Sequence, residues 1–178
     1  MIMLENKDRQ EAVEIDRKIM EALKDAPPNY TGLEKPGRFF DGACGEIAFR
    51  KWLVMKGIKF EETTRDDGRP DKQDFILFTR RRGRICTVNV KCSLHPRALY
   101  LMQPVDQNVK HHQDLYIGST GEDDGERVVV ILAGAIPRKQ FDLEAERKMV
   151  SIPSLIYPLG KLPYSMERVA ASFQRKIQ

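Results

Sequence analysis

The sequence predicts a mixed α/β protein in which a central sheet is flanked by helices. Three observations lead to this prediction. Apolar residues recur at three- and four-residue steps near both ends of the chain, as in amphipathic helices. Between those segments, short runs rich in Val, Ile, Leu and Phe are bounded by polar turns, as in strands. The 178 residues can bury a core without disulfides, so we expect one domain over residues 1–178.

Three segments have helical spacing. The first is expected over residues 4–24 and the last, at the C-terminal end, over residues 165–177. The second is expected over about 42–56, with Asp41 as its N-cap and Gly57 at its C-terminal stop.

Five segments have a strand pattern: residues 58–62, 74–80, 84–92, 114–119 and 127–136. The second and third are separated only by a short Arg- and Gly-containing turn, so we expect them to form a β-hairpin. The acidic stretch at 121–126 is expected to be a turn. Residues 93–113 have no clear pattern, and the proline-containing residues 137–163 are expected to be irregular.

The net charge, the absence of a long apolar run and the cysteine content indicate which kinds of partner and compartment to expect. Lys plus Arg total 30 and Asp plus Glu total 26, a net charge of +4 that permits a polyanionic partner without requiring one. Arg80, Arg81, Arg82 and Arg84 surround Gly83 at the hairpin tip, which is either a phosphate-binding surface or an ordinary solvated turn. No run of about 18 apolar residues is present, so we expect no transmembrane helix. Three cysteines without metal-binding spacing favour reduced thiols in a cytoplasmic protein.

Polar residues in and beside the predicted hairpin form a candidate site. Asp74 opens the first strand, while Asn89 and Lys91, two residues apart on the second, should share one face of the sheet. Glu46 lies on the second helix beside its apolar stripe, where a carboxylate needs a cation, a hydrogen bond or a metal. From the pattern alone, a half-exposed sheet explains the alternation equally well, and Glu46 would then be a rim residue paired with Arg50.

In this order, the residues resemble the PD-(D/E)xK, or restriction-endonuclease-like, superfamily of metal-dependent nucleases. Its members carry a Glu on the helix before the hairpin, an Asp at the first strand and an acid-x-Lys element on the second. These correspond to Glu46, Asp74 and Asn89-Val90-Lys91, and VNVKCS is similar to the family's second strand. The later segments DLYIGS and RVVVILAGAIP resemble phage- and plasmid-borne members. The resemblance covers about residues 40–140 and implies a restriction-endonuclease-like mixed sheet flanked by helices.

The resemblance implies hydrolysis of DNA phosphodiester bonds with Mg²⁺ or Mn²⁺. The side chains of Asp74 and Asn89 and the backbone carbonyl of Val90 would bind the metal, and Glu46 would bind through water or hold a second ion. Lys91 would orient or activate the attacking water, or stabilise the developing charge.

The implied partner is DNA, with no membrane and with a homodimer possible. Basic residues of two loops would contact its backbone phosphates: Arg80, Arg81, Arg82, Arg84, Lys35 and Arg38.

Two positions depart from the family pattern. Asn89 stands where the family has its second acid, and a site with one fewer charge should hold a divalent cation less tightly. Asp71 rivals Asp74 as the first acid because it follows Pro70, but Asp74 directly abuts the apolar strand and is preferred.

Three hypotheses therefore stay open at the level of sequence. The chain is a metal-dependent DNA endonuclease that works with Glu46 and Asp74 as its acids. In a variant of this hypothesis, Asn89 is an engineered replacement of an Asp, made to trap an inactive state. Alternatively, it is a nucleic-acid-binding relative that has lost catalysis. The third hypothesis is a structural or interaction protein of a mobile element, in which the polar cluster is incidental.

Overall fold

The computed structural model describes residues 1–22, 37, 39–63, 74–78, 85–95, 97–110, 113–150 and 153–174. The described residues form two sheets. The larger sheet contains β1 (Ile2–Leu4), β2 (Phe60–Glu62), β3 (Phe75–Phe78), β4 (Ile85–Ser93), β6 (Leu115–Asp123) and β7 (Val128–Pro137). The smaller sheet contains β5 (Tyr100–Pro104), β8 (Glu146–Met149) and β9 (Pro153–Pro158). The helices are α1 (Asn6–Ala22), α2 (Phe40–Met55), α3 (Val105–Lys110), α4 (Arg138–Glu144) and α5 (Met166–Phe173), with a 3₁₀ turn at Leu159–Lys161.

The larger sheet is mixed, with the strand order β1-β7-β6-β4-β3-β2. Strands β3 and β4 form the predicted antiparallel hairpin, whereas β4 and β6 are parallel neighbours. Parallel neighbours need a crossover connection, and here that connection carries β5 and α3. The predicted mixed α/β class is therefore confirmed.

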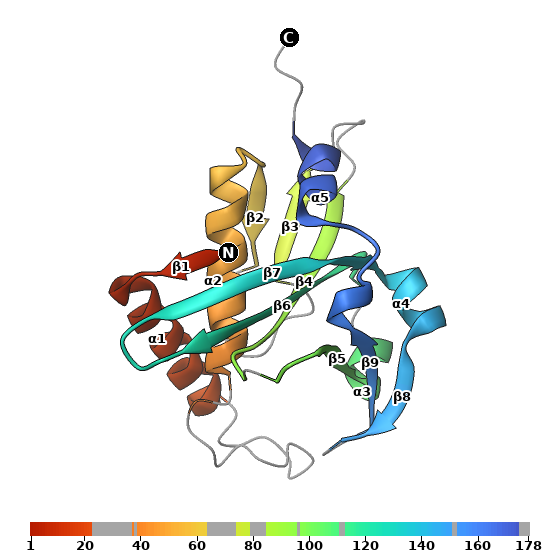
Figure 1. Cartoon of the computed structure of the whole chain (residues 1–178), viewed down its shortest axis with the longest axis horizontal. Helices are drawn as coiled ribbons and strands as arrows, with labels where there is room; N and C mark the ends of the chain where they lie inside the picture. Colours follow the sequence, from red (N-terminus) through yellow and green to blue (C-terminus); the bar gives the residue numbers. More distant parts are fainter. Residues whose placement is uncertain are drawn as a thin grey trace.

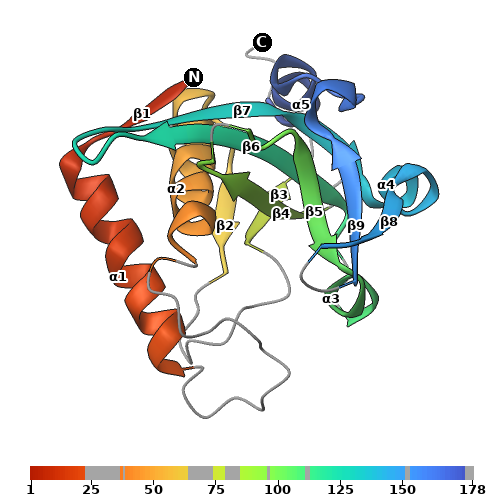
Figure 2. The ribbon, with the colours of Figure 1, turned by 60° about the horizontal axis from the view of Figure 1, so that its bottom comes forward.

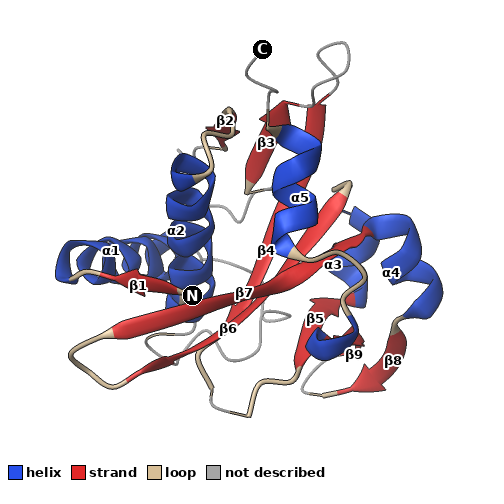
Figure 3. Cartoon of the chain, turned by 45° about the horizontal axis from the view of Figure 1, so that its top comes forward, coloured by secondary structure: helices blue, strands red, loops and turns tan. Residues whose placement is uncertain are grey.

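One face of the larger sheet packs against α2. Val88 and Val90 of β4 are buried in the same core cluster as Phe49 and Trp52 of the helix. Helix α1 lies against α2, where Arg50 donates to both carboxylate oxygens of Glu11. Helix α5 also contributes buried side chains to this core, farther along the sheet from α1 and α2 (Figures 1 and 3).

The opposite face of the larger sheet is covered by the smaller sheet. A second core cluster fills this layer, in which Tyr116 of β6 meets Leu101 of β5, Phe141 of α4 and Tyr157 of β9. Figure 2 shows this smaller sheet together with α3 and α4 at one end of the molecule, away from α1. The larger sheet therefore lies between two apolar layers, and β4 and β6 present side chains to both.

The expectation that residues 137–163 are irregular is wrong. This stretch forms α4, β8, β9 and the 3₁₀ turn. Its prolines lie at element boundaries rather than inside the elements: Pro137 precedes the first turn of α4, and Pro153 and Pro158 are the first and last residues of β9. Proline is tolerated at such positions because no internal hydrogen bond is lost there.

The expected turn at 121–126 is also partly wrong, because β6 continues to Asp123. Gly121 is a strand residue that pairs with Val130. A Cβ atom at this position would lie 2.1 Å from the carbonyl oxygen of Val129. Glycine is therefore needed for close backbone approach rather than for a turn.

The helix boundaries differ from prediction at three places. Helix α1 begins at Asn6 because residues 2–4 pair with β7 as β1. Helix α2 begins at Phe40, so Asp41 lies inside its first turn; the Asp41 carboxylate accepts the backbone N–H of Leu94 at 2.9 Å instead of capping the helix. Helix α5 ends at Phe173. The predicted stop at Gly57 is confirmed, with φ +63° and its N–H bonded to Val54.

Candidate functional site

The β3–β4 hairpin brings Asp74 beside Asn89. Phe75 pairs with Val88 in the hairpin register, so one further step places Asp74 next to Asn89. The Asp74 backbone N–H donates to the Val88 carbonyl at 2.9 Å, which keeps Asp74 in the ladder although β3 begins at the next residue. The Asp74 carboxylate in turn accepts the backbone N–H of Val90 at 2.5 Å. Asp74 is thus fixed at the centre of the candidate site by both its backbone and its side chain.

Asp74, Asn89 and Lys91 share one face of the sheet. Val88 and Val90 face α2, and alternation along a strand sends Asn89 and Lys91 to the opposite face. This agrees with the alternation expected from sequence. Phe75 and its face neighbour Leu77 are likewise buried in the α2 core, so Asp74 projects to the same side as its cross-strand neighbour Asn89.

The backbone of Val90 also faces Asp74. In an extended strand the N–H and C=O of one residue point to the same side, and the Val90 N–H points to Asp74. The next carbonyl, that of Lys91, points the other way and accepts the hydroxyl of Ser119 on β6 at 3.0 Å. The Val90 carbonyl is therefore directed to the side of β4 on which the Asp74 carboxylate lies.

Glu46 approaches from the other side of the sheet, on α2. The neighbouring Gly45 touches β4 and β6: a Cβ atom there would lie 2.4 Å from Cβ of Cys92 and 3.3 Å from Oγ of Ser119. Gly45 lies over Cys92, the residue after Lys91, so the next helix residue, Glu46, lies near the level of Lys91 along β4. This part of β4 extends beyond the residues that pair with β3. The glycine is what permits this close helix–sheet approach.

Arg50, the partner expected for Glu46 if Glu46 were a rim residue, binds other carboxylates. Arg50 donates to Glu11 at 2.5 and 2.7 Å and lies 3.5 Å from Glu62. These contacts tie α2 to α1 and to β2. Glu46, which is half-buried, lies one residue beyond the tightest point of helix–sheet contact instead.

The candidate site offers oxygen atoms to a divalent cation. Among the described residues, no group of three His, Cys, Asp or Glu side chains is arranged to bind a metal. The oxygen set at the hairpin is of another composition: one carboxylate (Asp74), one amide (Asn89) and one backbone carbonyl (Val90). Within the described part of the chain, Oδ1 of Asn89 is buried and has no hydrogen-bond partner. Such an oxygen is suited to a hard cation, which takes carboxylate, amide and carbonyl oxygens as ligands.

Several residues singled out in the sequence lie outside the described residues. They are the rival acid Asp71 and the basic residues Lys35, Arg38, Arg80, Arg81, Arg82 and Arg84.

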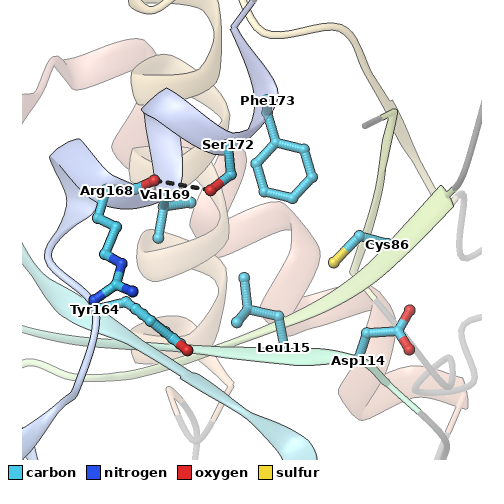
Figure 4. Close-up of a pocket in the computed structure, with 8 residues that line it drawn as sticks. All are labelled: Cys86, Asp114, Leu115, Tyr164, Arg168, Val169, Ser172 and Phe173. Carbon is cyan, nitrogen blue, oxygen red and sulfur yellow. Dashed lines mark hydrogen bonds between the residues drawn. The ribbon is translucent and has the colours of Figure 1, made fainter. Parts of the chain in front are cut away.

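Sequence reasoning did not predict the pocket of about 300 Å³ beside α5 (Figure 4). Figure 4 shows Arg168 and Tyr164 next to each other on one side and Cys86 and Asp114 on the other. The Arg168 guanidinium lies 4.4 Å from the centre of the Tyr164 ring, a cation–π contact. Burial raises the pKa of the Cys86 thiol to about 12, which disfavours the thiolate form. The helical periodicity of residues 165–177 predicts which face of α5 is buried, but not that this pocket is left beside it.

The pocket and the candidate metal site lie apart. Leu115 lines the pocket from the α2 side of the sheet, whereas Asn89 projects to the opposite side. Asp114 at the pocket rim is used structurally, since it accepts both the backbone N–H and the hydroxyl of Thr87. The pocket is therefore not part of the hairpin site.

Comparisons with protein-family models, with curated proteins and with solved structures give no significant match. Among the described residues, no helix has the length and apolar character needed to cross a membrane. All three cysteines are free thiols.

Proposed function

We propose that the chain is a metal-dependent DNA endonuclease with a restriction-endonuclease-like fold. The observation that carries this proposal is the hydrogen bond from the Val90 N–H to the Asp74 carboxylate. Val90 lies between Asn89 and Lys91, so this bond holds the carboxylate beside both of these residues. Asp74, Asn89 and Lys91 follow the order of the PD-(D/E)xK pattern, with Asn89 in the place of its second acid.

The arrangement of elements supports the same proposal. The helix that carries Glu46 precedes the hairpin, and the hairpin carries Asp74 on one strand and Asn89-Val90-Lys91 on the other. Strand β4 then continues in a mixed sheet beside the parallel β6. The close contact at Gly45 brings Glu46 to the level of Lys91 from the opposite face.

Each residue has a proposed role. Asp74, the Asn89 amide oxygen and the Val90 carbonyl would hold Mg²⁺ or Mn²⁺, with Glu46 bonded to a metal-bound water. When bound, the cation neutralises the scissile phosphate and lowers the pKa of a water molecule. Lys91 is half-buried on the same face, and there its ammonium orients the attacking water or stabilises charge on the phosphate oxygens.

DNA is the proposed substrate because the chain is basic and four arginines follow closely on one another in the sequence between β3 and β4. The net charge is +4, and Arg80, Arg81, Arg82 and Arg84 lie within five residues of one another in the sequence. Contacts of such residues with phosphates release counterions, so binding should weaken steeply with salt. Alanine at all four positions should lower both the affinity and the slope of its dependence on salt concentration. Unchanged values would show that this loop has no part in DNA binding.

A second candidate function is DNA binding without cleavage. The observation that favours it is the amide at position 89. With Asn89 in place of an acid, the described hairpin supplies one carboxylate, whereas two would hold the metal more tightly. This alternative predicts salt-dependent binding of duplex DNA with no cleavage at any divalent cation concentration.

The test is incubation of the purified chain with supercoiled plasmid, single-stranded DNA and RNA, in Mg²⁺, Mn²⁺ or EDTA. We expect nicked and linear plasmid in the presence of metal and intact plasmid in EDTA. Binding without cleavage in both metals would favour the second function. If the chain neither binds nor cleaves these nucleic acids, the result would favour a structural or interaction protein.

A further inference from the structure

The pocket beside α5 combines an apolar lining with two opposite charges. Its apolar lining includes the buried side chains of Leu115 on β6 and of Val169 and Phe173 on α5. Figure 4 shows Arg168 on one side of the pocket and Asp114 on the other. The volume of about 300 Å³ lies at the lower end of the range for small-molecule sites, roughly 300–1,000 Å³. A cavity of this size suits a single ring with short substituents.

The guanidinium of Arg168 is available to an anionic ligand. It lies 4.4 Å from the centre of the Tyr164 ring, and two backbone hydrogen bonds with Ala135 of β7 fix Tyr164 in turn. Arg168 is exposed, and within the described residues no ion pair joins its guanidinium to a carboxylate. A cation–π contact leaves the N–H donors of a guanidinium unused, and these donors match the two oxygens of a carboxylate.

Asp114 is a fixed acceptor on the other side of the pocket. Its backbone N–H donates to the Thr87 carbonyl at 2.9 Å, and its Oδ2 accepts both the backbone N–H and the hydroxyl of Thr87. Among the described residues, Oδ1 has no hydrogen-bond partner. A carboxylate held in this way loses little conformational freedom when it accepts a cationic donor, and such charge-assisted bonds are the stronger kind.

The other polar side chains of the pocket add no charge. Burial and the nearby Asp114 raise the pKa of the Cys86 thiol to about 12, so the neutral thiol dominates. The Ser172 hydroxyl donates to the backbone carbonyl of Arg168 at 3.0 Å, the bond marked in Figure 4. The described lining therefore offers one cation and one anion on opposite sides.

We propose that this pocket binds a zwitterionic aminocarboxylate in which a hydrocarbon ring separates the carboxylate from the ammonium group. The carboxylate pairs with Arg168, the ammonium donates to Asp114, and the ring lies against the apolar lining between them. A free α-amino acid is a poorer ligand, because its two charges share one carbon and cannot reach both sides. The pocket lies apart from the candidate metal site, so this proposal does not rest on the nuclease function.

The test measures binding of three ring compounds to the full chain by two-dimensional NMR. The compounds are 4-(aminomethyl)benzoate, which has both charged groups, 4-methylbenzoate, which lacks the ammonium, and benzylamine, which lacks the carboxylate. We expect 4-(aminomethyl)benzoate to bind most tightly and to shift the amide signals of Leu115 and Val169. If it does not bind at millimolar concentration, or binds no more tightly than the two compounds with a single charge, the proposal is overturned.

Two substitutions separate the two contacts. Arg168→Gln should weaken binding of 4-(aminomethyl)benzoate by about tenfold or more, and Asp114→Asn should remove its advantage over 4-methylbenzoate. The Asn amide oxygen can still accept from Thr87, so this variant should keep its fold. The exposed controls Arg147→Gln on β8 and Asp106→Asn on α3 should bind like wild type. Wild-type affinity in Arg168→Gln, or an equal loss in the controls, would overturn the proposal. No DNA or metal is present, so this failure is distinct from failure of the nuclease proposal.

Discussion

The backbone N–H of Val90 donates to Oδ2 of Asp74 across 2.5 Å, and this bond joins the first strand of the hairpin to the second where their candidate catalytic residues meet. Because Asp74 is only 9% exposed, its carboxylate is held by the backbone of β4 in a largely desolvated setting. A hydrogen bond to a charged group in such a setting is stronger than one between neutral groups.

Replacing Asp74 by Asn should therefore affect both stability and activity. The amide oxygen can still accept the Val90 N–H, but the charge is lost, so we expect a loss of roughly 1–2 kcal/mol in the free energy of unfolding. Metal-dependent cleavage should fall to background. Urea denaturation and a plasmid assay measure the two effects, with Asp106→Asn as a control because Asp106 is exposed on α3. If Asp74→Asn cleaves DNA at the wild-type rate, Asp74 is not a catalytic residue, and the rival acid Asp71 would be favoured.

The replacement Asn89→Asp tests whether a second carboxylate is tolerated and useful. Burial raises the pKa of a carboxyl group, so the destabilisation should be absent below about pH 4 and should grow as pH rises and the group is forced to ionise. Mg²⁺ should restore stability by binding the folded state, and cleavage should increase. The measurement is the thermal midpoint at pH 4 and pH 7.5, with and without Mg²⁺. A midpoint that is independent of both pH and Mg²⁺ would contradict a metal position at Asn89.

Gly45 and Gly42 of helix α2 give a matched pair of substitutions. A Cβ at Gly45 would lie 2.4 Å from Cβ of Cys92, whereas a Cβ at Gly42 meets nothing within 4 Å. Gly45→Ala should push α2 off the sheet and cost about 1–3 kcal/mol, while Gly42→Ala should stabilise the helix by about 0.5–1 kcal/mol. Gly45→Ala should also weaken Mn²⁺ binding because it displaces Glu46. Equal stability of the two variants would show that the close approach is unimportant.

Acid stability should depend on the Asp8–Lys51 pair between α1 and α2. Burial acts to raise the pKa of Asp8, but hydrogen bonds from Lys51 and from the backbone of Glu5 outweigh it, and the net pKa lies below the ordinary value of 3.8. A lowered pKa stabilises the fold above the unfolded-state pKa, and this contribution is lost as pH falls through the folded-state pKa. The stability difference between wild type and Asp8→Asn should therefore be largest near neutral pH and should shrink below about pH 4. The exposed control Glu126→Gln should follow the wild-type curve. A difference between wild type and Asp8→Asn that stays constant down to pH 2 would contradict this assignment.

The hairpin and the long helices were predictable because their signals are local. Alternation in β4 and the three- to four-residue spacing in α1 and α2 each appear within one segment. The segment after β7 was not predictable, because its prolines lie at element boundaries and its strand β9 is stabilised by pairing with β5, which is distant in the sequence. Gly121 was misread for a similar reason: the backbone that requires a glycine there belongs to β7.

The candidate site was predictable in its order but not in its surroundings. The shared face of Asn89 and Lys91 follows from their spacing of two residues. The contact of Gly45 with Cys92 depends on how a helix packs on a sheet. No single segment of the sequence contains that information.

Cleavage of supercoiled plasmid by wild type and by Lys91→Met, each in Mn²⁺ and in EDTA, decides whether the hairpin holds a metal-dependent active site. Methionine keeps the length of the side chain and removes only the ammonium group, and circular dichroism would establish that the variant folds. We expect metal-dependent nicking by wild type and a loss of at least about tenfold in rate for Lys91→Met, because a positioned proton-transfer or charge-stabilising group contributes at least this much. Equal rates for the two proteins, or cleavage by wild type that persists in EDTA, would contradict a metal-dependent site at Asp74, Asn89 and Lys91.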